Sequence, residues 1–341
     1  MVSRVAARMV TAIEGLRGER RSSLWGSAVD VTLALARAPQ HYLRAQLVLL
    51  GSLAGGGRAD GDDLEELACG LELLHLFMLV HDDVIDDSRL RRGRATVHVA
   101  LLEAAPALGL PNARNLAIVV GNLLHVLAMR SFARADRRGA AFGVILDACL
   151  RTGVGQFEDI VGWDQRSTYV GAFRTTTEDK AAYQSFAAPF ASGLLLANPD
   201  GDAQKALAWG RHMGVAMQGL DDAADLVGDP AITGKDNFRD IVEGRLSLAL
   251  MILLKAASPD ERAFLRTVIG AGALEPSDRV ELDRLLGAHQ VIHACRAVIS
   301  DEIAAATQIA DSAQFCAEAR EGLAAFEQGL KETLETMLAA E

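Results

Sequence analysis

The chain has 341 residues, of which 50% are hydrophobic and 23% charged, a composition typical of globular proteins and not of disordered or fibrous ones. Its 34 Lys and Arg against 45 Asp and Glu give a net charge of -11, which disfavours non-specific attraction to nucleic acid or to anionic membranes. An anionic substrate would therefore need a local group of cations or a metal ion.

Apolar residues follow the spacing of α-helices in both halves of the chain. Apolar residues recur at i, i+3, i+4 and i+7 within residues 64–80 and 116–127, and only 8 prolines interrupt the chain. Strand-like alternation is not sustained, and aromatic residues make up only 5%. Glycine and proline breaks, such as those at residues 55–57 and 228–230, are too short for a domain linker. We therefore predict an all-α fold, with one large bundle of long helices over residues 1–341.

The cysteines and the apolar stretches bear on location. Cys69, Cys149, Cys295 and Cys316 are widely separated and form no C-x-x-C pair, which favours a reducing compartment. No stretch matches a signal peptide or approaches the ~20 apolar residues that a membrane span needs. We expect a cytoplasmic protein without a transmembrane segment.

An aspartate cluster follows the first strongly helical run. Asp82, Asp83 and Asp86 stand at i, i+1 and i+4, and we expect them to share one side of a helix. Carboxylates at the C-terminal end of a helix repel each other and oppose the helix dipole, so a cation should compensate them. Oxygen ligands suit Mg²⁺, which is commonly shared between carboxylates and substrate phosphates.

The same spacing returns at Asp221, Asp222 and Asp225, again after a helical run. Composition alone predicts less than one such match in a chain of this length, so two matches indicate a shared function. A solvated acidic surface or a helix cap would explain either cluster alone. Arginines at residues 89–94 and Lys180 add cations that suit phosphate oxygens, although a basic surface turn is the simpler explanation for the arginines. The combination predicts a diphosphate site.

The segment from Glu72 to His98, which contains the first cluster and the run Arg91-Arg92-Gly93, resembles the trans-isoprenyl diphosphate synthases. This family, the polyprenyl synthetases, includes geranylgeranyl diphosphate synthases. The resemblance extends over about residues 38–250, and the further matching residues are Gly155, Gln156, Asp159, Lys180, Gln218, Asp221, Asp222, Asp225, Gly234, Lys235, Asp240, Glu243, Gly244 and Arg245. It implies the isoprenoid synthase fold, a homodimer, and two aspartate motifs that face each other across a central cavity.

The resemblance also implies roles for individual residues. The substrates would be an allylic diphosphate and isopentenyl diphosphate, joined with the help of Mg²⁺ at the six motif aspartates. Gln218 would face the reacting carbons. Arg91, Lys180 and Lys235 would neutralise the allylic diphosphate, and Arg44, His75 and Arg92 would bind the diphosphate of isopentenyl diphosphate. Phe77 and Met78 would form the floor of the product cavity and limit products to about C15 to C20, with C20 geranylgeranyl diphosphate favoured. Simple packing in the core is the other explanation for Phe77.

Two departures from the family pattern keep other functions open. His41 stands where the family has a lysine, which would make binding of isopentenyl diphosphate weaker or pH-dependent, and Ala181 stands where it prefers threonine. A prenyltransferase with another acceptor, or a partner subunit, is therefore an alternative. A class I terpene cyclase shares the first motif but not the second. An HD-type metal phosphohydrolase would use the pair His81-Asp82, with further ligands from His75, His98 and His125.

Overall fold

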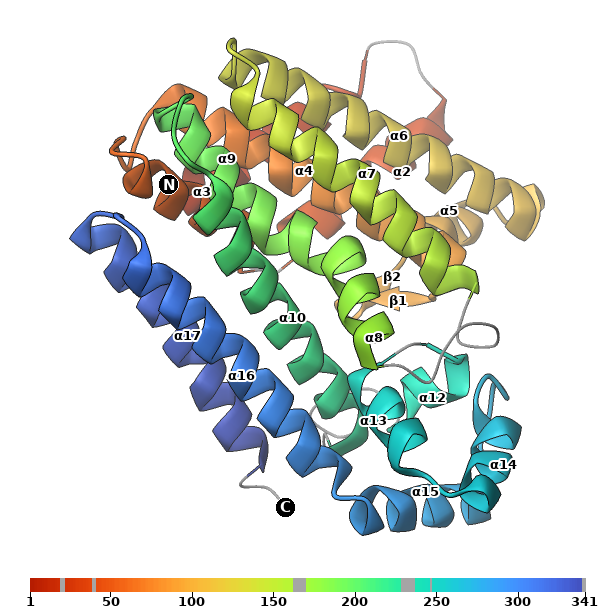
Figure 1. The fold of residues 1–341 in the computed structure, drawn as a ribbon. Coiled ribbons are helices and arrows are strands. Elements are labelled where there is room, and N and C mark those ends of the chain that lie inside the picture. The colour runs from red at the N-terminus through yellow and green to blue at the C-terminus, as the bar shows by residue number, and fades with distance from the viewer. Residues whose placement is uncertain (19–21, 39–40, 162–169, 228–236, 246, 339–341) are drawn as a thin grey trace. The chain divides into compact units, whose positions relative to one another are not determined.

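The computed structural model describes residues 1–18, 22–38, 41–161, 170–227, 237–245 and 247–338 (Figure 1). Helices account for most of them, so the prediction of an all-α fold is confirmed. The strands in this part of the chain are β1 (Leu90–Arg91) and β2 (Arg94–Ala95), which pair antiparallel in a short hairpin. The helices form two compact units, one of Met1–Gly143 with Ser192–Gly201 and one of Val144–Ala191 with Asp202–Glu341.

The first unit contains the first aspartate motif. Its elements besides the hairpin are α1 (Val2–Glu14), α2 (Ser23–Arg37), α3 (Leu43–Ala54), α4 (Asp62–Ile85), α5 (Val97–Ala104), the short 3-10 helix η1 (Pro106–Leu108) and α6 (Gly109–Ala135). Helices α7 (Ala140–Val161) and α9 (Ala188–Ala197) contribute residues to both units.

Helices α4 and α6 pack along one another in the first unit. Gly70 makes the close approach possible, because a β-carbon there would lie 2.5 Å from Cε1 of the buried Phe132. The first turn of α4 contains acidic residues, whose negative charges are stabilised by the positive end of the helix dipole. Helix α4, which carries the motif at its C-terminal end, is therefore packed closely against α6.

The segment Pro106–Ala135, which includes α6, is long and apolar enough to cross a membrane by length and composition. Within its most apolar window, 44% of the residues are buried in the structure. A buried core helix has the same length and composition, so this helix alone does not indicate a membrane span.

The second unit contains the second aspartate motif. Its elements are α8 (Val170–Thr177), the π-helix η3 (Glu178–Ala187), α10 (Gln204–Val227), α12 (Arg239–Glu243), α13 (Leu248–Ala256), α14 (Pro259–Val268), α15 (Pro276–Ala288), α16 (Val291–Ser312) and α17 (Ala317–Leu338).

Helix α10 runs through the second unit and packs against η3, α16 and α17 (Figure 1). Its fully buried Trp209 donates its indole N–H to Oε1 of Glu327 on α17, at 2.9 Å. Nearer the motif, apolar side chains of α10, α13, α15 and α16 form one core, with Leu248, Leu285 and Ile299 at its centre. The motif end of α10 is thereby fixed against α13 and α16.

Candidate active site

The first aspartate motif lies where α4 ends. Asp82 and Asp83 belong to the last turn of the helix, and Asp86 is its C-cap residue. A rotation of about 100° per residue places the three aspartates within about 100° of one another around the helix, with Asp86 between Asp82 and Asp83. Asp83 is in fact buried, at 1% exposure, whereas Asp82 and Asp86 are partly exposed. The three aspartates therefore differ in burial, which their spacing did not predict.

Arg91, from the hairpin, holds the buried carboxylate of Asp83. Its Nε and Nη2 donate to Oδ1 of Asp83 at 2.8 and 2.6 Å, and Nη2 also lies 3.3 Å from Oδ2 of Asp82. Burial raises the pKa of Asp83, and Arg91 opposes that rise. In this structure Arg91, expected to bind a diphosphate, is thus the counter-ion that keeps the end of α4 and the hairpin together.

A second polar group of the first unit combines residues from α3, α4 and the hairpin. Arg44 is buried, at 7% exposure, and burial lowers the pKa of its guanidinium to about 10. Glu72, also buried, accepts a hydrogen bond from the backbone N–H of Ala45 at 3.2 Å, and burial raises its pKa. Burial, with Arg44 and Arg92 nearby, puts the pKa of His75 well below its usual range, so the imidazole is neutral. The predicted residues Arg44, His75 and Arg92 are therefore brought together, with the carboxylate of Glu72 beside them.

His41 lies in the segment that precedes α3. Its side chain is exposed, and its backbone carbonyl accepts a hydrogen bond from Nε2 of Gln46 at 2.6 Å. Whether His41 serves the site stays a prediction.

The predicted floor residues lie on α4, one turn or more before Asp82, and Phe77 packs against α6. Its ring lies 4.6 Å from the imidazole of His81, edge to face, and 4.9 Å from that of His125. Gly121 makes room for His81, because a β-carbon there would lie 2.3 Å from Cδ2 of that ring. Met78 is partly buried. The contact between His125 and Phe77 could not be predicted from the sequence, because α6 is distant from Phe77 in the chain and only the packing aligns the two helices.

The second motif lies near the end of α10, and its middle aspartate is also buried. Asp222 is 4% exposed, and its Oδ1 accepts a hydrogen bond from Nε2 of Gln218 at 2.8 Å. Its Oδ2 accepts a hydrogen bond from the backbone N–H of Leu248 at 2.7 Å, at the start of α13, where a helix dipole favours negative charge. Burial, with Asp240 nearby, raises the pKa of Asp222 well above its usual range.

Asp240 adds a further carboxylate to the second motif. Its backbone N–H donates to Oδ2 of Asp225 at 3.1 Å. Burial and the charge of Asp225 raise the pKa of the Asp240 side chain to about 6. The sequence pointed to Asp240 as a match to the family but gave it no role, because its distance from the motif depends on how the chain returns after α10.

The two motifs have the same arrangement of one buried aspartate between two more exposed ones. In each, the middle aspartate is buried and anchors neighbouring structure, Asp83 through Arg91 and Asp222 through α13. The outer pairs, Asp82 with Asp86 and Asp221 with Asp225, are partly or fully exposed. Because residues at i and i+4 lie on the same side of a helix, each outer pair presents two carboxylates together.

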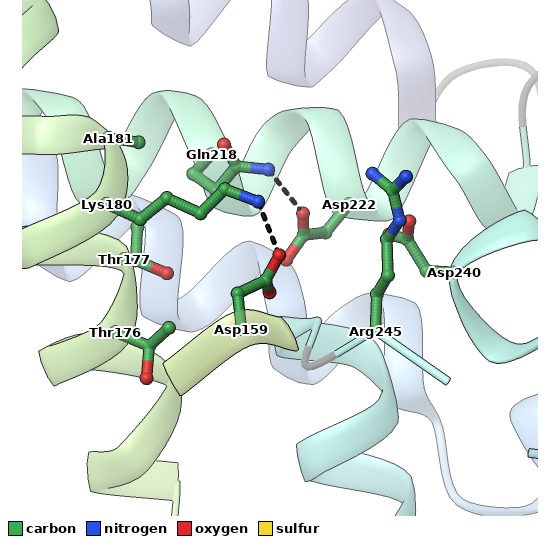
Figure 2. A pocket seen from close by; sticks show the side chains of 9 residues that line it. All are labelled: Asp159, Thr176, Thr177, Lys180, Ala181, Gln218, Asp222, Asp240 and Arg245. Atoms are coloured by element: carbon green, nitrogen blue, oxygen red, sulfur yellow. Dashed lines mark hydrogen bonds and ion pairs between the residues drawn. The ribbon is translucent and has the colours of Figure 1, made fainter. Parts of the chain in front are cut away.

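A cavity of about 100 Å³ adjoins the second motif (Figure 2). Its lining residues are Asp159, Thr176, Thr177, Lys180, Ala181, Gln218, Asp222, Asp240 and Arg245. The ammonium of Lys180 pairs with Asp159, and both face the cavity together with Gln218 and Asp222. Two predicted residues, Lys180 and Gln218, are thereby brought together with Asp222. The predicted Lys235 lies outside the described residues.

Thr177 is a lining residue that the sequence did not single out. It precedes Lys180 by three positions, is buried, and lies below the Lys180 side chain in Figure 2. Ala181 lines the same cavity with only a methyl group. The helical spacing of Thr177 and Ala181 was readable in the sequence, but their shared cavity was not.

The chain matches the model of the family described as polyprenyl synthetase over residues 30–284. It is 30% identical over 281 residues to a short chain isoprenyl diphosphate synthase of Methanothermobacter thermautotrophicus, with 79% of this chain and 82% of the relative covered. It is 32% identical over 221 residues to a geranylgeranyl diphosphate synthase of Mycobacterium tuberculosis, with 64% and 59% covered.

A solved structure with a similar fold is that of a geranylgeranyl pyrophosphate synthase of Corynebacterium glutamicum, complexed with isoprenyl diphosphate and magnesium. The TM-score is 0.85 at 24% identity, over 96% of this chain and 97% of the other. The all-α architecture, the paired aspartate motifs and the match over most of the chain lead to one conclusion. The chain belongs to the polyprenyl synthetase family and is an enzyme of the isoprenyl diphosphate synthase type with the isoprenoid synthase fold.

Proposed function

We propose that the protein is a trans-prenyltransferase that joins an allylic diphosphate to isopentenyl diphosphate. In this reaction the allylic carbon–oxygen bond breaks, a carbon–carbon bond forms to isopentenyl diphosphate, and diphosphate and a proton leave. The observation that carries the proposal is the repeated motif architecture, with a buried middle aspartate and an outward pair at i and i+4 in both units.

The outward carboxylates fit Mg²⁺. Asp82, Asp86, Asp221 and Asp225 offer only oxygen donors, and burial together with neighbouring negative charge raises the pKa of Asp240, an effect that a bound cation would reverse. Among the described residues, no three Asp, Glu, His or Cys side chains form a group able to hold a metal by themselves. This is compatible with Mg²⁺ sites in which substrate phosphates supply further ligands. Bound Mg²⁺ would neutralise charge on the departing diphosphate.

The assignment of substrates to residues follows the charges. We infer that the two aspartate motifs converge on the allylic diphosphate, with Lys180 supplying a further positive charge. Arg44 and Arg92, beside the neutral His75, suit the diphosphate of isopentenyl diphosphate, because guanidinium groups bind phosphate oxygens through paired hydrogen bonds. Gln218, held by Asp222, keeps its side-chain oxygen available to the cavity.

We infer geranylgeranyl diphosphate as the product, with Phe77 as the floor. The contacts of Phe77 with His81 and His125 support this role, because they brace the ring from α4 and α6. Relatives of this chain carry the names of farnesyl, geranylgeranyl and geranylfarnesyl synthases, so chain length varies among similar sequences.

We further propose one domain and a homodimer in the cytoplasm. Helix α7 carries an exposed apolar stripe on one face, formed by Leu146, Leu150, Val154, Phe157 and Ile160. A stripe of this length suits burial against a second copy. None of the four cysteines forms a disulfide bond, which suits a reducing compartment. Sedimentation of the wild type and of Leu150→Asp tests the dimer, which this charge should weaken.

Incubation with Mg²⁺, radiolabelled isopentenyl diphosphate and the C5, C10 or C15 allylic diphosphate tests the function. The expected result is labelled prenyl diphosphate, most of it C20. No labelled prenyl alcohol after dephosphorylation, with any starter, would refute elongation. Incorporation of an allylic group into another acceptor would instead favour the alternative prompted by His41 and Ala181. Family membership leaves HD-type hydrolysis without support.

A further inference from the structure

The segment that carries Lys180 is a π-helix. It extends over ten residues, Glu178–Ala187, between α8 and α9, and its flanking residues Thr177 and Ala188 have α-helical dihedrals. A π-helix of this length is rare, and π-helical turns concentrate at functional sites because they re-aim the side chains they carry. The direction of the Lys180 side chain therefore depends on whatever holds this segment in place.

Helix α7 touches the backbone of Lys180 at Gly155. A β-carbon on Gly155 would lie 2.4 Å from the backbone nitrogen of Lys180, 2.7 Å from its Cα and 2.9 Å from the carbonyl carbon of Asp179. These are backbone atoms, which cannot turn away as the end of a long side chain can. Gly155 has no positive φ that would demand glycine, so the close approach itself is what requires it.

The opposite side of the π-helix is closed by α10. A β-carbon on Gly214 would lie 2.4 Å from Cβ and 2.5 Å from Cα of Ala182. The segment is therefore held between Gly155 and Gly214, and it cannot retreat from α7 without pressing on α10. Any atom added at Gly155 must shift Lys180 itself.

Helix α7 also contacts the ammonium group at the end of the Lys180 side chain. Asp159, one turn after Gly155, pairs with the ammonium at the cavity (Figure 2). Residues at i and i+4 lie on the same face of a helix, so one face of α7 contacts both the backbone and the charge of Lys180.

We propose that Gly155 is a positioning residue, which sets where the Lys180 ammonium lies in the cavity by letting α7 touch the Lys180 backbone. This inference rests on the proposed function, in which Lys180 acts on the allylic diphosphate. An ordinary contact needs about 3.4 Å or more where 2.4 Å is available, so an added methyl group displaces the backbone by about 1 Å. A misplacement of about 1 Å can lower turnover ~100-fold.

The test compares Gly155→Ala with Gly329→Ala, an exposed position inside α17 and away from the apolar stripe of α7. A β-carbon at Gly329 would meet nothing within 4 Å, so both variants gain the same helix propensity and only one gains a clash. We expect Gly155→Ala to lower kcat roughly 10- to 100-fold and to leave the KM for isopentenyl diphosphate within about twofold. Gly329→Ala should retain wild-type kcat. A folded Gly155→Ala protein with wild-type kcat would overturn the inference.

A double-mutant cycle separates positioning from a general loss of structure. If Gly155 acts through Lys180, Gly155→Ala should change the kcat of Lys180→Gln by no more than about threefold, because the group it positions is already gone. A further loss of tenfold or more in that background would show that Gly155 acts elsewhere.

Asp159→Asn is a second variant, for use if Gly155→Ala does not fold. This substitution removes the charge that pairs with Lys180 and adds no volume. It should lower kcat at unchanged KM for isopentenyl diphosphate and be non-additive with Lys180→Gln; wild-type kcat would overturn positioning by α7. Wild-type protein that makes no prenyl product would instead count against the proposed function.

Discussion

The ion pair between Arg91 and Asp83 makes a sharp prediction about stability. Arg91→Gln removes the positive charge and leaves the carboxylate of Asp83, which is 1% exposed, without its two short hydrogen bonds. Breaking a fully buried ion pair costs about 3–5 kcal/mol, because the remaining charge cannot be solvated. The Arg91 side chain is 29% exposed, so water can partly replace it, and we expect a loss of about 2–3 kcal/mol.

The expected change in Tm follows from the size of the chain. At about 2.1 cal/mol/K per residue, 341 residues give an unfolding entropy of about 0.7 kcal/mol/K, so this loss lowers Tm by roughly 3–4 °C. The assay is thermal unfolding followed by circular dichroism without substrate or Mg²⁺, so that any effect on diphosphate binding is excluded. Arg89→Gln, an exposed neighbour, is the matched control and should leave Tm unchanged.

Two further measurements test the physical cause. Asp83→Asn combined with Arg91→Gln should recover much of the lost stability, because no buried charge remains. The destabilisation by Arg91→Gln should also shrink as pH falls towards 4. The native pKa of Asp83 is already raised, so the isolated carboxyl takes up a proton in the native protein before it does so in the unfolded chain. An Arg91→Gln protein within 1 °C of the wild-type Tm at pH 7.5, or no recovery in the double variant, would refute the argument.

Three other predictions concern the carboxylate cluster, the floor and the departure at His41. The native pKa of Asp240 is about 6, against 3.8 for an unperturbed aspartate, so its ionisation costs stability as pH rises from about 4 to 6. Asp240→Asn should therefore stabilise the protein by up to about 3 kcal/mol at pH 7.5 in EDTA and by little at pH 4.5 in chemical denaturation; equal effects at both pH values would contradict this. Phe77→Ala should lengthen the prenyl product in chain-length analysis, because the ring braced by His125 is removed; an unchanged product would place the floor elsewhere. His41→Lys should lower the KM for isopentenyl diphosphate by adding a permanent charge, and an unchanged KM would mean that the residue points away from the site.

Several features of the site were readable in the sequence because they are local. Helical periodicity and the scarcity of proline predicted the all-α fold, which the structure and the related proteins confirm. The spacing of the two aspartate motifs singled out the ends of α4 and α10 as the places with chemistry. The structure also brings Lys180 to one cavity with Gln218 and Asp222, although Lys180 is distant from these two residues in the chain.

Tertiary structure alone determined which aspartate of each motif is buried and which ones are exposed. The sequence presents Asp82, Asp83 and Asp86 as equivalent carboxylates, yet packing of the hairpin against α4 buries Asp83 and gives it Arg91 as its partner. Likewise Asp222 becomes an anchor because α13 begins beside it. The spacing of residues along one helix fixes which side chains share a face, but whether that face meets water, a cation or another helix depends on segments far away in the chain.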